Sequence, residues 1–244
     1  MKAMILAAGK GTRLKHLTNN RPKALVELNG KPLLGILIEK LKKEGFDHIL
    51  INIHHFGELI VNYITKNNNF GIKVEFSDER DRLLDTGGAI LKAANFFEGD
   101  QPVLIHNVDI FSDIKLKPVL ESFKRGDDIA NLLVRKRNTK RYLLFDEKMY
   151  LAGWTDKRTN SFKHVKGVAT QHYNEYAFSG IWFAKPQFVK LIPYKGAFSI
   201  VDAWLEIARQ NKIKGIVDNS ALWRDAGTPE NLSSLEILLK KQNI

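Results

Sequence analysis

The sequence predicts an α/β protein built around a mostly parallel central sheet. Apolar strand-like runs alternate with amphipathic helical segments through the first half of the chain, which is the pattern of repeated strand–helix–strand units. The first run, at 3–8, is continuously apolar and is followed by a glycine, as expected of a parallel strand covered on both faces. An apolar content of 44% over 244 residues can supply a large core.

The strand at 3–8 ends abruptly in the run Gly9-Lys10-Gly11-Thr12-Arg13. Glycines at positions 9 and 11 allow a tight turn that brings bare N–H groups close to an anion. Arg13 and Lys23 could neutralise the charge on phosphate oxygens. These residues predict a phosphate-binding loop, although an ordinary strand-to-helix turn with solvated basic residues would have the same pattern.

The next elements follow from hydrophobic periodicity. Residues 33–44 are expected to form an amphipathic helix, because apolar residues recur at three- and four-residue spacing from Leu34 to Leu41 and Gly45 is a stop signal. The same criteria predict strands at 23–28, 47–53, 72–76 and 102–109 and helices at 56–65, 89–97 and 116–124.

Three polar or glycine-rich segments are expected at one edge of the sheet. They are the loop at 7–13, the segment 85–88 that leads into the helix at 89–97, and the strand end at 107–109. In open parallel sheets, ligands bind at the carboxyl ends of strands. The sequence therefore predicts a binding site built from these three segments.

The second half of the chain has a different character. After a strand at 128–135, a polar stretch dotted with aromatic residues runs from 136 to 176 and contains short strand-like pieces such as 142–145. A strand at 176–184 alternates strongly, and Ser199 is a plausible N-cap for a following helix. The remaining expected elements are helices at 186–191, 199–210 and 231–241, a strand at 214–217 and a glycine turn within 222–230.

The composition limits the function classes. Lys and Arg number 38 against 27 Asp and Glu, and a net charge of +11 attracts either nucleic acid or small phosphorylated substrates. The basic residues are scattered and are not interleaved with exposed aromatic residues, so nucleic-acid binding is not expected. The absence of cysteine excludes disulfides, thiolate metal sites and a cysteine nucleophile.

Membrane insertion is not expected either. No apolar stretch approaches the roughly 20 residues that cross a bilayer. The N-terminus lacks the charged region, apolar segment and cleavage site of a signal peptide, so the expected location is cytoplasmic.

The chain resembles the sugar-1-phosphate nucleotidyltransferases in five segments that occur in the family's order. They are LAAGKGTRL, RPKALVEL, DTGGAI, IHNVD and WRDAGTPENL, and together they span nearly the whole sequence. The segments 86–88, 178–181 and 223–228 look most like those of N-acetylmuramate-1-phosphate uridylyltransferases and mannose-1-phosphate guanylyltransferase-like proteins.

This resemblance implies a fold and a domain organisation. The fold would be a Rossmann-like, glycosyltransferase A-type three-layer sandwich with a mixed, mostly parallel central sheet. A single domain would span 1–244, with a nucleotide-binding half at 1–135 and a half at 136–244 that binds the sugar and provides a second metal ligand.

The resemblance also implies a reaction. The phosphate oxygen of a sugar 1-phosphate would attack the α-phosphorus of a nucleoside triphosphate, and pyrophosphate would leave. Such a transfer depends on positioning and charge neutralisation, so it requires no nucleophilic side chain. The implied cofactor is Mg²⁺, which prefers oxygen ligands, and Asp109 and Asp225 match the family's two metal-binding positions.

The same matching assigns the other site residues. Arg13 and Lys23 would be the catalytic cations that grip the triphosphate. The implied nucleotide-binding residues are Ala7, Ala8 and Gly9 at the base, Gly11, Thr12 and Arg13 at the phosphates, Asp85, Thr86, Gly87 and Gly88 in a loop over base and ribose, and Asn107 at the nucleoside or sugar. The implied sugar-phosphate residues are Ser179, Gly180 and Asp202.

Two departures from the family pattern leave part of the site open. Many relatives have Gly before the metal-binding acid, whereas this chain has Val108. Relatives that transfer thymidylate have a Glu-Lys-Pro run that contacts the sugar phosphate, and this chain lacks it. Lys157, Lys163 and Lys166 therefore stay alternative candidates for the lysine on the sugar side.

The histidines and tryptophans are expected to have structural roles. His54 and His55 are adjacent on the chain and would point to opposite faces, so they and His106 are expected to be structural or at the surface. The four tryptophans are expected in the core or in a pocket wall; they are Trp154, Trp182, Trp204 and Trp223.

Two other functions fit the same fold. One is a cytidylyltransferase for a small phospho-alcohol such as phosphocholine, and the other is a nucleotide-sugar sensor without turnover. The presence of both cations and both acids argues against a sensor, which would be expected to have lost catalytic ligands. The sequence favours no particular base; Arg80 lies near where some relatives read it.

Overall fold

The computed structural model describes residues 1–165 and 172–241, and its chain forms two compact units that interleave in sequence. The first unit comprises Met1–Leu83, His106–Leu116 and Ser220–Ile244, and the second comprises Leu84–Ile105 and Lys117–Asn219. Within the described part of the chain, no helix is both long enough and apolar enough to cross a membrane. The division at residue 135 and the single domain stay predictions.

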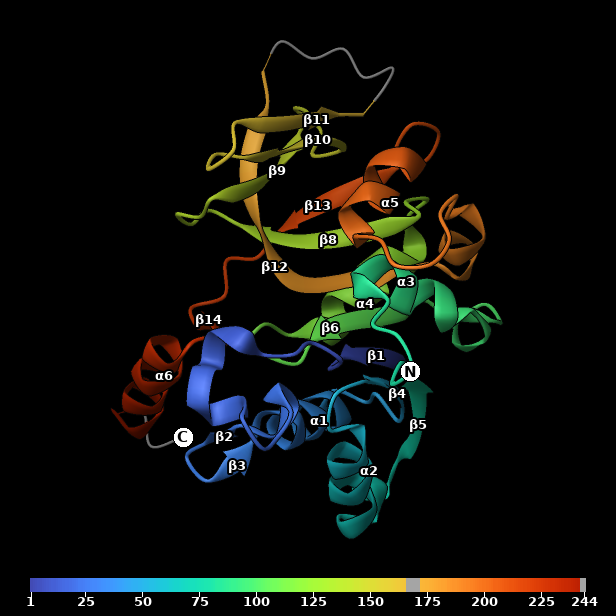
Figure 1. The fold of residues 1–244 in the computed structure, drawn as a ribbon. Helices are drawn as coiled ribbons and strands as arrows, with labels where there is room; N and C mark the ends of the chain where they lie inside the picture. The colour runs from blue at the N-terminus through green and yellow to red at the C-terminus, as the bar shows by residue number, and fades with distance from the viewer. Residues whose placement is uncertain (166–171, 242–244) are drawn as a thin grey trace. The chain divides into compact units, whose positions relative to one another are not determined.

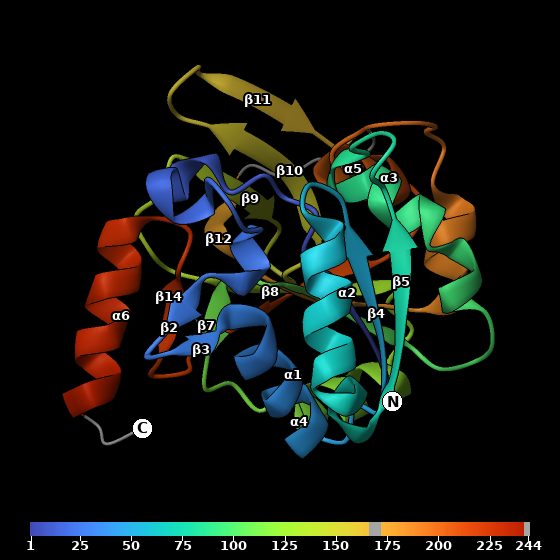
Figure 2. The same ribbon diagram turned by 60° about the horizontal axis from the view of Figure 1, so that its bottom comes forward.

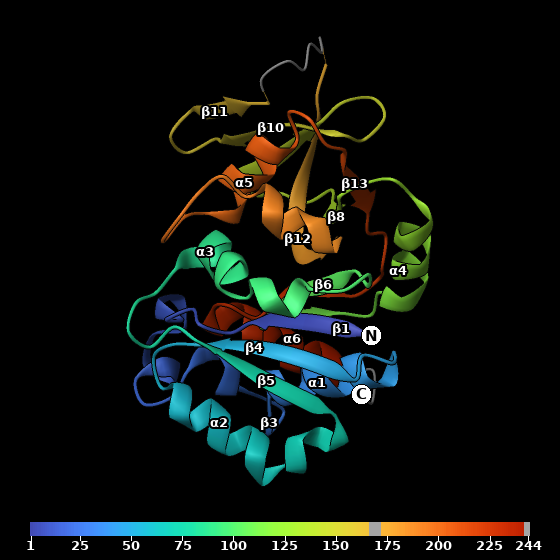
Figure 3. The ribbon, with the colours of Figure 1, turned by 90° about the vertical axis from the view of Figure 1, so that its right-hand side faces the viewer.

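A parallel sheet forms the centre of the first unit. The strands β1 (Lys2–Leu6), β4 (His48–Ile53) and β5 (Lys73–Asp78) lie side by side in this order, as Figure 3 shows. Leu6 pairs with Asn52, and Ile53 pairs with Asp78. The three strands run in the same direction, so their carboxyl ends share one edge, as predicted.

Helices and short strands complete this unit. They are η1 (Thr12–Thr18), η2 (Lys23–Leu25), β2 (Glu27–Leu28), β3 (Lys31–Pro32), α1 (Leu33–Lys43), α2 (Gly57–Lys66), η3 (Asn68–Gly71), β7 (Ile110–Ser112), β14 (Trp223–Asp225) and α6 (Pro229–Lys241). The strand expected at 23–28 is mostly a turn of 3-10 helix, because Leu25 donates to the Pro22 carbonyl at 2.9 Å. Figure 2 shows α6 beside β14.

The loop after β1 rests on an apolar cluster. Leu14 is fully buried together with Leu28, and Leu235 of α6 packs in the same cluster. Burial of this kind, at roughly 25 cal/mol per Å² of apolar surface, fixes the base of the loop while its polar residues stay accessible. The apolar cluster therefore holds the loop after β1 in a fixed position.

The second unit contains a mixed sheet. Its strands are β8 (Ala130–Arg135), β9 (Arg141–Phe145), β10 (Leu151–Asp156), β11 (Ser161–His164), β12 (Asn174–Ala184) and β13 (Ile213–Val217). β8 pairs antiparallel with β12 and parallel with β13, while β9, β10 and β11 form the antiparallel succession visible in Figure 1. The expected α/β fold with a mixed sheet is confirmed.

The sequence pattern did not resolve two of these strands. β10 and β11 fall in the polar stretch at 136–176, and every residue of β11 is exposed, so this strand has no buried face that would give an apolar alternation. The remaining elements are α3 (Asp85–Lys92), η4 (Ala94–Phe97), β6 (Val103–Asn107), α4 (Leu116–Arg125), η5 (Pro186–Leu191) and α5 (Ile200–Ile207). Ser199 is the predicted N-cap of α5, and its hydroxyl accepts the Val201 N–H at 3.3 Å.

Candidate active site

The glycine-rich loop has the geometry that its sequence predicts. Gly11 adopts a φ of 67°, and a Cβ at this position would lie 2.9 Å from Thr18 Cγ2. Glycine is therefore required here for both conformation and space. The Gly11 carbonyl accepts the Leu14 N–H at 2.8 Å, and Arg13, the second residue of η1, has 60% of its side chain exposed.

Backbone hydrogen bonds bring two distant acids to this loop. The N–H of Val108 donates to the Leu6 carbonyl at 3.2 Å, which places Asp109 beside the end of β1. The N–H of Ala226 donates to the Asp109 carbonyl at 2.8 Å, and Asp225 pairs with Ile110 in the β7–β14 ladder. The chain thus carries both acids to one place in the first unit.

Four predicted residues form a charged cluster there. Lys23 Nζ contacts Asp109 Oδ2 directly. Arg13 Nη2 lies 3.9 Å from the same oxygen, and Arg13 Nη1 lies 3.6 Å from Asp225 Oδ2. The cations and carboxylates assigned from separate motifs therefore lie together in the first unit.

The pKa values of the two carboxylates are shifted in opposite directions. Burial raises the pKa of Asp109, but the charge and hydrogen bond of Lys23 outweigh burial and hold that pKa below its ordinary value. Burial and the adjacent negative charge of Asp109 raise the pKa of Asp225. An added cation beside Asp225 would therefore stabilise its ionised form.

Gly227 lies where the two carboxylates and the Arg13 guanidinium meet. A Cβ at Gly227 would lie 2.6 Å from Arg13 Nη2, 2.6 Å from Asp225 Oδ1 and 3.0 Å from Asp109 Oδ2. Two carboxylates of different segments thus converge on one small space, and such oxygens are the ligands that Mg²⁺ prefers. No group of three or more His, Cys, Asp or Glu residues that could hold a metal occurs in residues 1–165 and 172–241. The fit is to a hard cation that takes one or two carboxylates and completes its shell with other oxygens.

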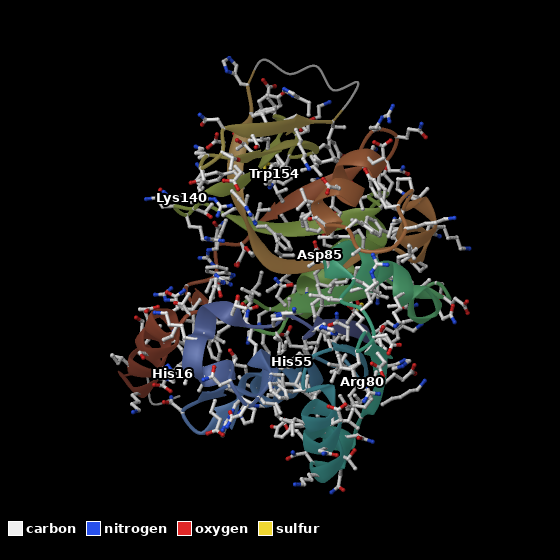
Figure 4. The ribbon with its side chains drawn as sticks, viewed as in Figure 1. His16, His55, Arg80, Asp85, Lys140 and Trp154 are labelled. Atoms are coloured by element: carbon white, nitrogen blue, oxygen red, sulfur yellow. The ribbon has the colours of Figure 1, made fainter. Side chains whose placement is uncertain are left out.

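The segment 85–88 in the second unit differs from the expected loop. It forms the first turn of α3, which starts four residues before the predicted helix (Figure 4 labels Asp85). The Gly87 N–H donates to the Phe198 carbonyl at 2.9 Å, and Thr86 Oγ1 accepts the Ile200 N–H at 3.0 Å. The glycines lie inside the helix because they permit close packing on this neighbouring segment.

Two of the residues expected on the sugar side are deeply buried. Ser179 has no exposed surface, and Gly180 is buried beside it with a φ of 78°. The pairing of β12 with β8 shifts register between Phe178 and Trp182, so both residues lie in this irregular part of the strand. Their proposed contact with the sugar phosphate stays a prediction.

Asp202 and one candidate lysine are accessible. Lys163 Nζ donates to Asp202 Oδ1 at 2.5 Å and lies 5.5 Å from the ring centroid of Trp154, which Figure 4 labels. Lys157 instead donates to Glu175 at 2.6 Å. Lys166 lies outside the described residues.

The histidines are structural or at the surface, and most tryptophans are buried, as expected. His106 is fully buried, and burial together with the charge of Lys40 lowers its pKa to about 3. His54 bonds to the Glu79 carbonyl at 2.7 Å, and His55 is exposed (Figure 4). The buried tryptophans are Trp182, Trp204 and Trp223.

Asn107, expected at the nucleoside or sugar, is the last residue of β6 and is half-buried.

Sequence reasoning missed Asn52 and Glu79. Both side chains are buried at the end of the parallel sheet, and the Asn52 side chain bonds to the backbone of Ala7 and Ala8. The N–H groups of two of the three residues expected at the base are thus bonded within the protein, and a Cβ at Gly9 would meet no atom within 4 Å. The signal in the sequence was a polar residue inside the apolar run at 49–53.

Residues 2–242 match the family model described as nucleotidyl transferase. The chain belongs to this family. Two similar nucleotidyl transferases are N-acetylmuramate alpha-1-phosphate uridylyltransferases. The one from Neisseria meningitidis is 30% identical over 240 residues, covering 98% of each chain, and the one from Caulobacter vibrioides is 29% identical over 232 residues, covering 93% of this chain and 92% of the relative.

A solved structure supports the fold. The protein from Bacillus anthracis described as a glucose-1-phosphate thymidylyltransferase superposes with a TM-score of 0.81 at 19% identity, covering 98% of this chain and 94% of that chain. The nucleotidyl transferase thus has the Rossmann-like, glycosyltransferase A-type fold that the sequence motifs implied.

Proposed function

We propose that this nucleotidyl transferase moves a nucleoside monophosphate from a nucleoside triphosphate to a sugar 1-phosphate, with Mg²⁺ as cofactor. The observation that carries the proposal is the cluster of Arg13, Lys23, Asp109 and Asp225 at the glycine-rich loop. Family membership supports the reaction class, and the names of the two uridylyltransferases support the acceptor class.

The bond changes require no covalent enzyme intermediate. An oxygen of the sugar 1-phosphate forms a bond to the α-phosphorus, the bond from the α-phosphorus to the bridging oxygen breaks, and pyrophosphate leaves with the electron pair. The attacking phosphate is already ionised at neutral pH, so no side chain has to remove a proton. Catalysis then depends on charge neutralisation and alignment.

Arg13 and Lys23 supply that neutralisation. The planar guanidinium of Arg13 can donate to two phosphate oxygens at once, and its exposed side chain leaves this fork accessible. Lys23 is a compact charge, held beside Asp109 and only 13% exposed. In the proposed roles, Arg13 binds the triphosphate and Lys23 stabilises charge that develops at the α-phosphorus.

Asp109 and Asp225 would hold the metal. Mg²⁺ supplies neutralisation of the triphosphate and of the pyrophosphate leaving group when bound. The carboxylates suit this cation because their oxygens converge beside Gly227, and because the raised pKa of Asp225 means that an added cation would favour its ionised form.

Asp202 and Lys163 are the residues proposed to bind the acceptor. Asp202 and Lys163 form an accessible ion pair next to Trp154, a combination of polar groups and an aromatic ring that suits a phosphorylated sugar. Lys163 is proposed over Lys157 because its partner Asp202 is itself a candidate sugar-phosphate residue, whereas Lys157 pairs with Glu175. The proposed location of the reaction is the cytoplasm.

A pyrophosphate-release screen tests the proposal. UTP, GTP, CTP, ATP and dTTP are each combined with N-acetylmuramate 1-phosphate, other sugar 1-phosphates and phosphocholine, with Mg²⁺ present or chelated. The expected result is release that requires both Mg²⁺ and a sugar 1-phosphate, and UTP with N-acetylmuramate 1-phosphate is the first pair to test. Release with CTP and phosphocholine alone, or nucleotide binding without turnover, would contradict it.

A further inference from the structure

Three neighbouring strands of the first unit end at one edge, and a polar residue bridges their ends. Ala7 directly follows β1, Asn52 is the next-to-last residue of β4, and Glu79 directly follows β5. Asn52 and Glu79 are only 3% and 1% exposed. Polar side chains this deeply buried are retained where their hydrogen bonds are needed.

The Asn52 amide is bonded on both sides. Its Oδ1 accepts the N–H groups of Ala7 at 2.6 Å and Ala8 at 3.2 Å. Its Nδ2 donates to Glu79 Oε1 at 2.8 Å. Only one orientation of the amide satisfies these partners, because the oxygen must face the two donors and the nitrogen must face the carboxylate.

Glu79 continues the connection to the loop after β5. Its backbone N–H donates to the Ile53 carbonyl at 2.8 Å, and its carbonyl is bonded to His54 Nδ1 at 2.7 Å. The next residue, Arg80, donates to Glu58 Oε1 at 2.8 Å and to Asp78 (Figure 4). These hydrogen bonds hold the start of the loop after β5 in place, and none of them involves the loop after β1.

We propose that Asn52 and Glu79 are positioning residues for the nucleotide. They act through the backbone of Ala7 and Ala8, which lead directly into Gly9 and the phosphate-binding residues that follow. This inference rests on the proposed function, because it assumes that the loop after β1 binds a nucleoside triphosphate. It adds two residues that do not themselves touch the substrate.

The hydrogen bonds that run from Glu79 through Asn52 to Ala7 and Ala8, here called the relay, predict how changes of donor and acceptor affect the loop. Asn52→Asp replaces the donor that faces Glu79 with a second carboxylate oxygen, and two buried carboxylates repel each other. Adding Glu79→Gln restores a donor and an acceptor at the same contact with the direction of the hydrogen bond reversed. The oxygen that accepts the Ala7 and Ala8 N–H groups is present in both variants.

The experiment compares Asn52→Asp, the double variant Asn52→Asp with Glu79→Gln, and a matched control. Asn131→Asp is the control: Asn131 is also a buried strand residue, and its amide donates to Asp128 Oδ2 at 3.2 Å in the orientation that satisfies both of its polar atoms. Asn131 lies on β8 of the second unit. The same chemical change is thus made beside a carboxylate that has no link to the nucleotide loop's hydrogen bonds.

The first readout is steady-state pyrophosphate release. Asn52→Asp is expected to raise KM for the triphosphate by about tenfold or more, since small displacements of a positioned substrate cost this much. KM for the sugar 1-phosphate is expected to change less than about twofold, and the double variant should recover most of the loss. The control should change stability and leave KM for the triphosphate as it is. Equal changes in both KM values, or no recovery in the double variant, would overturn the proposal.

The second readout does not depend on activity. Hydrogen exchange at the single amides of Ala7 and Ala8, measured by NMR, is expected to accelerate in Asn52→Asp and to slow again in the double variant. Unchanged exchange would overturn the relay even if the enzyme is active. Absence of pyrophosphate release from the wild-type protein would instead refute the proposed function, so the two failures are distinguishable.

Discussion

Asp109 and Asp225 are close together but chemically unequal. Lys23 compensates the charge of Asp109, whereas the pKa of Asp225 is raised by burial and by the charge of Asp109 itself. A metal that joins the two carboxylates would remove this imbalance. Because the two carboxylates have opposite pKa shifts, substitutions at the two positions are expected to affect stability differently.

Asp225→Asn should reduce activity without reducing stability. The amide is neutral, so it relieves the unfavourable burial of charge, and its oxygen can still accept the Gly227 N–H that Asp225 Oδ1 accepts at 2.7 Å. We expect kcat/KM to fall by about a hundredfold or more, as for loss of one group that stabilises transition-state charge, while the unfolding midpoint stays equal or rises. Asp109→Asn should lower both, because it leaves Lys23 without its carboxylate. Wild-type kcat/KM in either variant would refute the metal assignment.

Arg13→Ala should weaken use of the triphosphate selectively. A charge-assisted hydrogen bond contributes about 1.5–3 kcal/mol, so KM for the triphosphate should rise about 10- to 100-fold. KM for the sugar 1-phosphate should change little. Arg21→Ala is the matched control, since 43% of the Arg21 side chain is exposed and its nearest carboxylate oxygen, on Glu27, lies 3.4 Å away. Comparable losses for both substrates would argue against the placement of Arg13.

His106 should make folding stability depend on pH. Burial and the charge of Lys40 lower its pKa to about 3, so the folded protein holds the neutral form while the unfolded chain titrates near its ordinary value. Its contribution is complete above pH ~6.5 and is lost as the pH falls toward about 3, at up to about 1.4 kcal/mol per pH unit. Denaturation at pH 7, 6 and 5 should show this slope in the wild-type protein and a shallower one in His106→Gln. Parallel slopes would contradict it.

At the scale of elements, hydrophobic periodicity located most helices and strands. It placed α1, with its buried residues from Leu33 to Leu41, to within a residue, because one face of that helix packs against the core. It failed for β11, whose residues are all exposed, and for the start of α3. In α3 the decisive factor is a close approach by residues far along the chain, which leaves no periodic signal.

Gly88→Ala tests that close approach. A Cβ at Gly88 would lie 2.2 Å from the Gly196 carbonyl oxygen, which is backbone and cannot move aside easily. We expect the free energy of unfolding to fall by about 1–3 kcal/mol, as for other overpacked sites. Gly126→Ala is the control, because the nearest atom to its Cβ would be 3.7 Å away. Denaturant titration of both variants measures the difference, and equal stabilities would refute the packing account of α3.

At the scale of the whole molecule, the sequence predicted the fold class and the charged site residues, but not the buried polar residues that hold the loop after β1. Arg13, Lys23, Asp109 and Asp225 could be found because each lies in a motif that resembles a known family. Asn52 and Glu79 could not, because their role depends on three strand ends meeting at one edge, and only the structure shows which side chains bridge them. The two compact units also interleave in sequence, so no linker composition marks them.

Pyrophosphate release by the wild-type protein and by Asp225→Asn, measured with UTP and N-acetylmuramate 1-phosphate and then with the other substrate pairs, tests the central claim most directly. The account predicts release by the wild-type protein that requires both substrates and stops when Mg²⁺ is chelated, and little release by the variant. Release that persists without Mg²⁺ and is unchanged by Asp225→Asn, or no release with any pair, would contradict it.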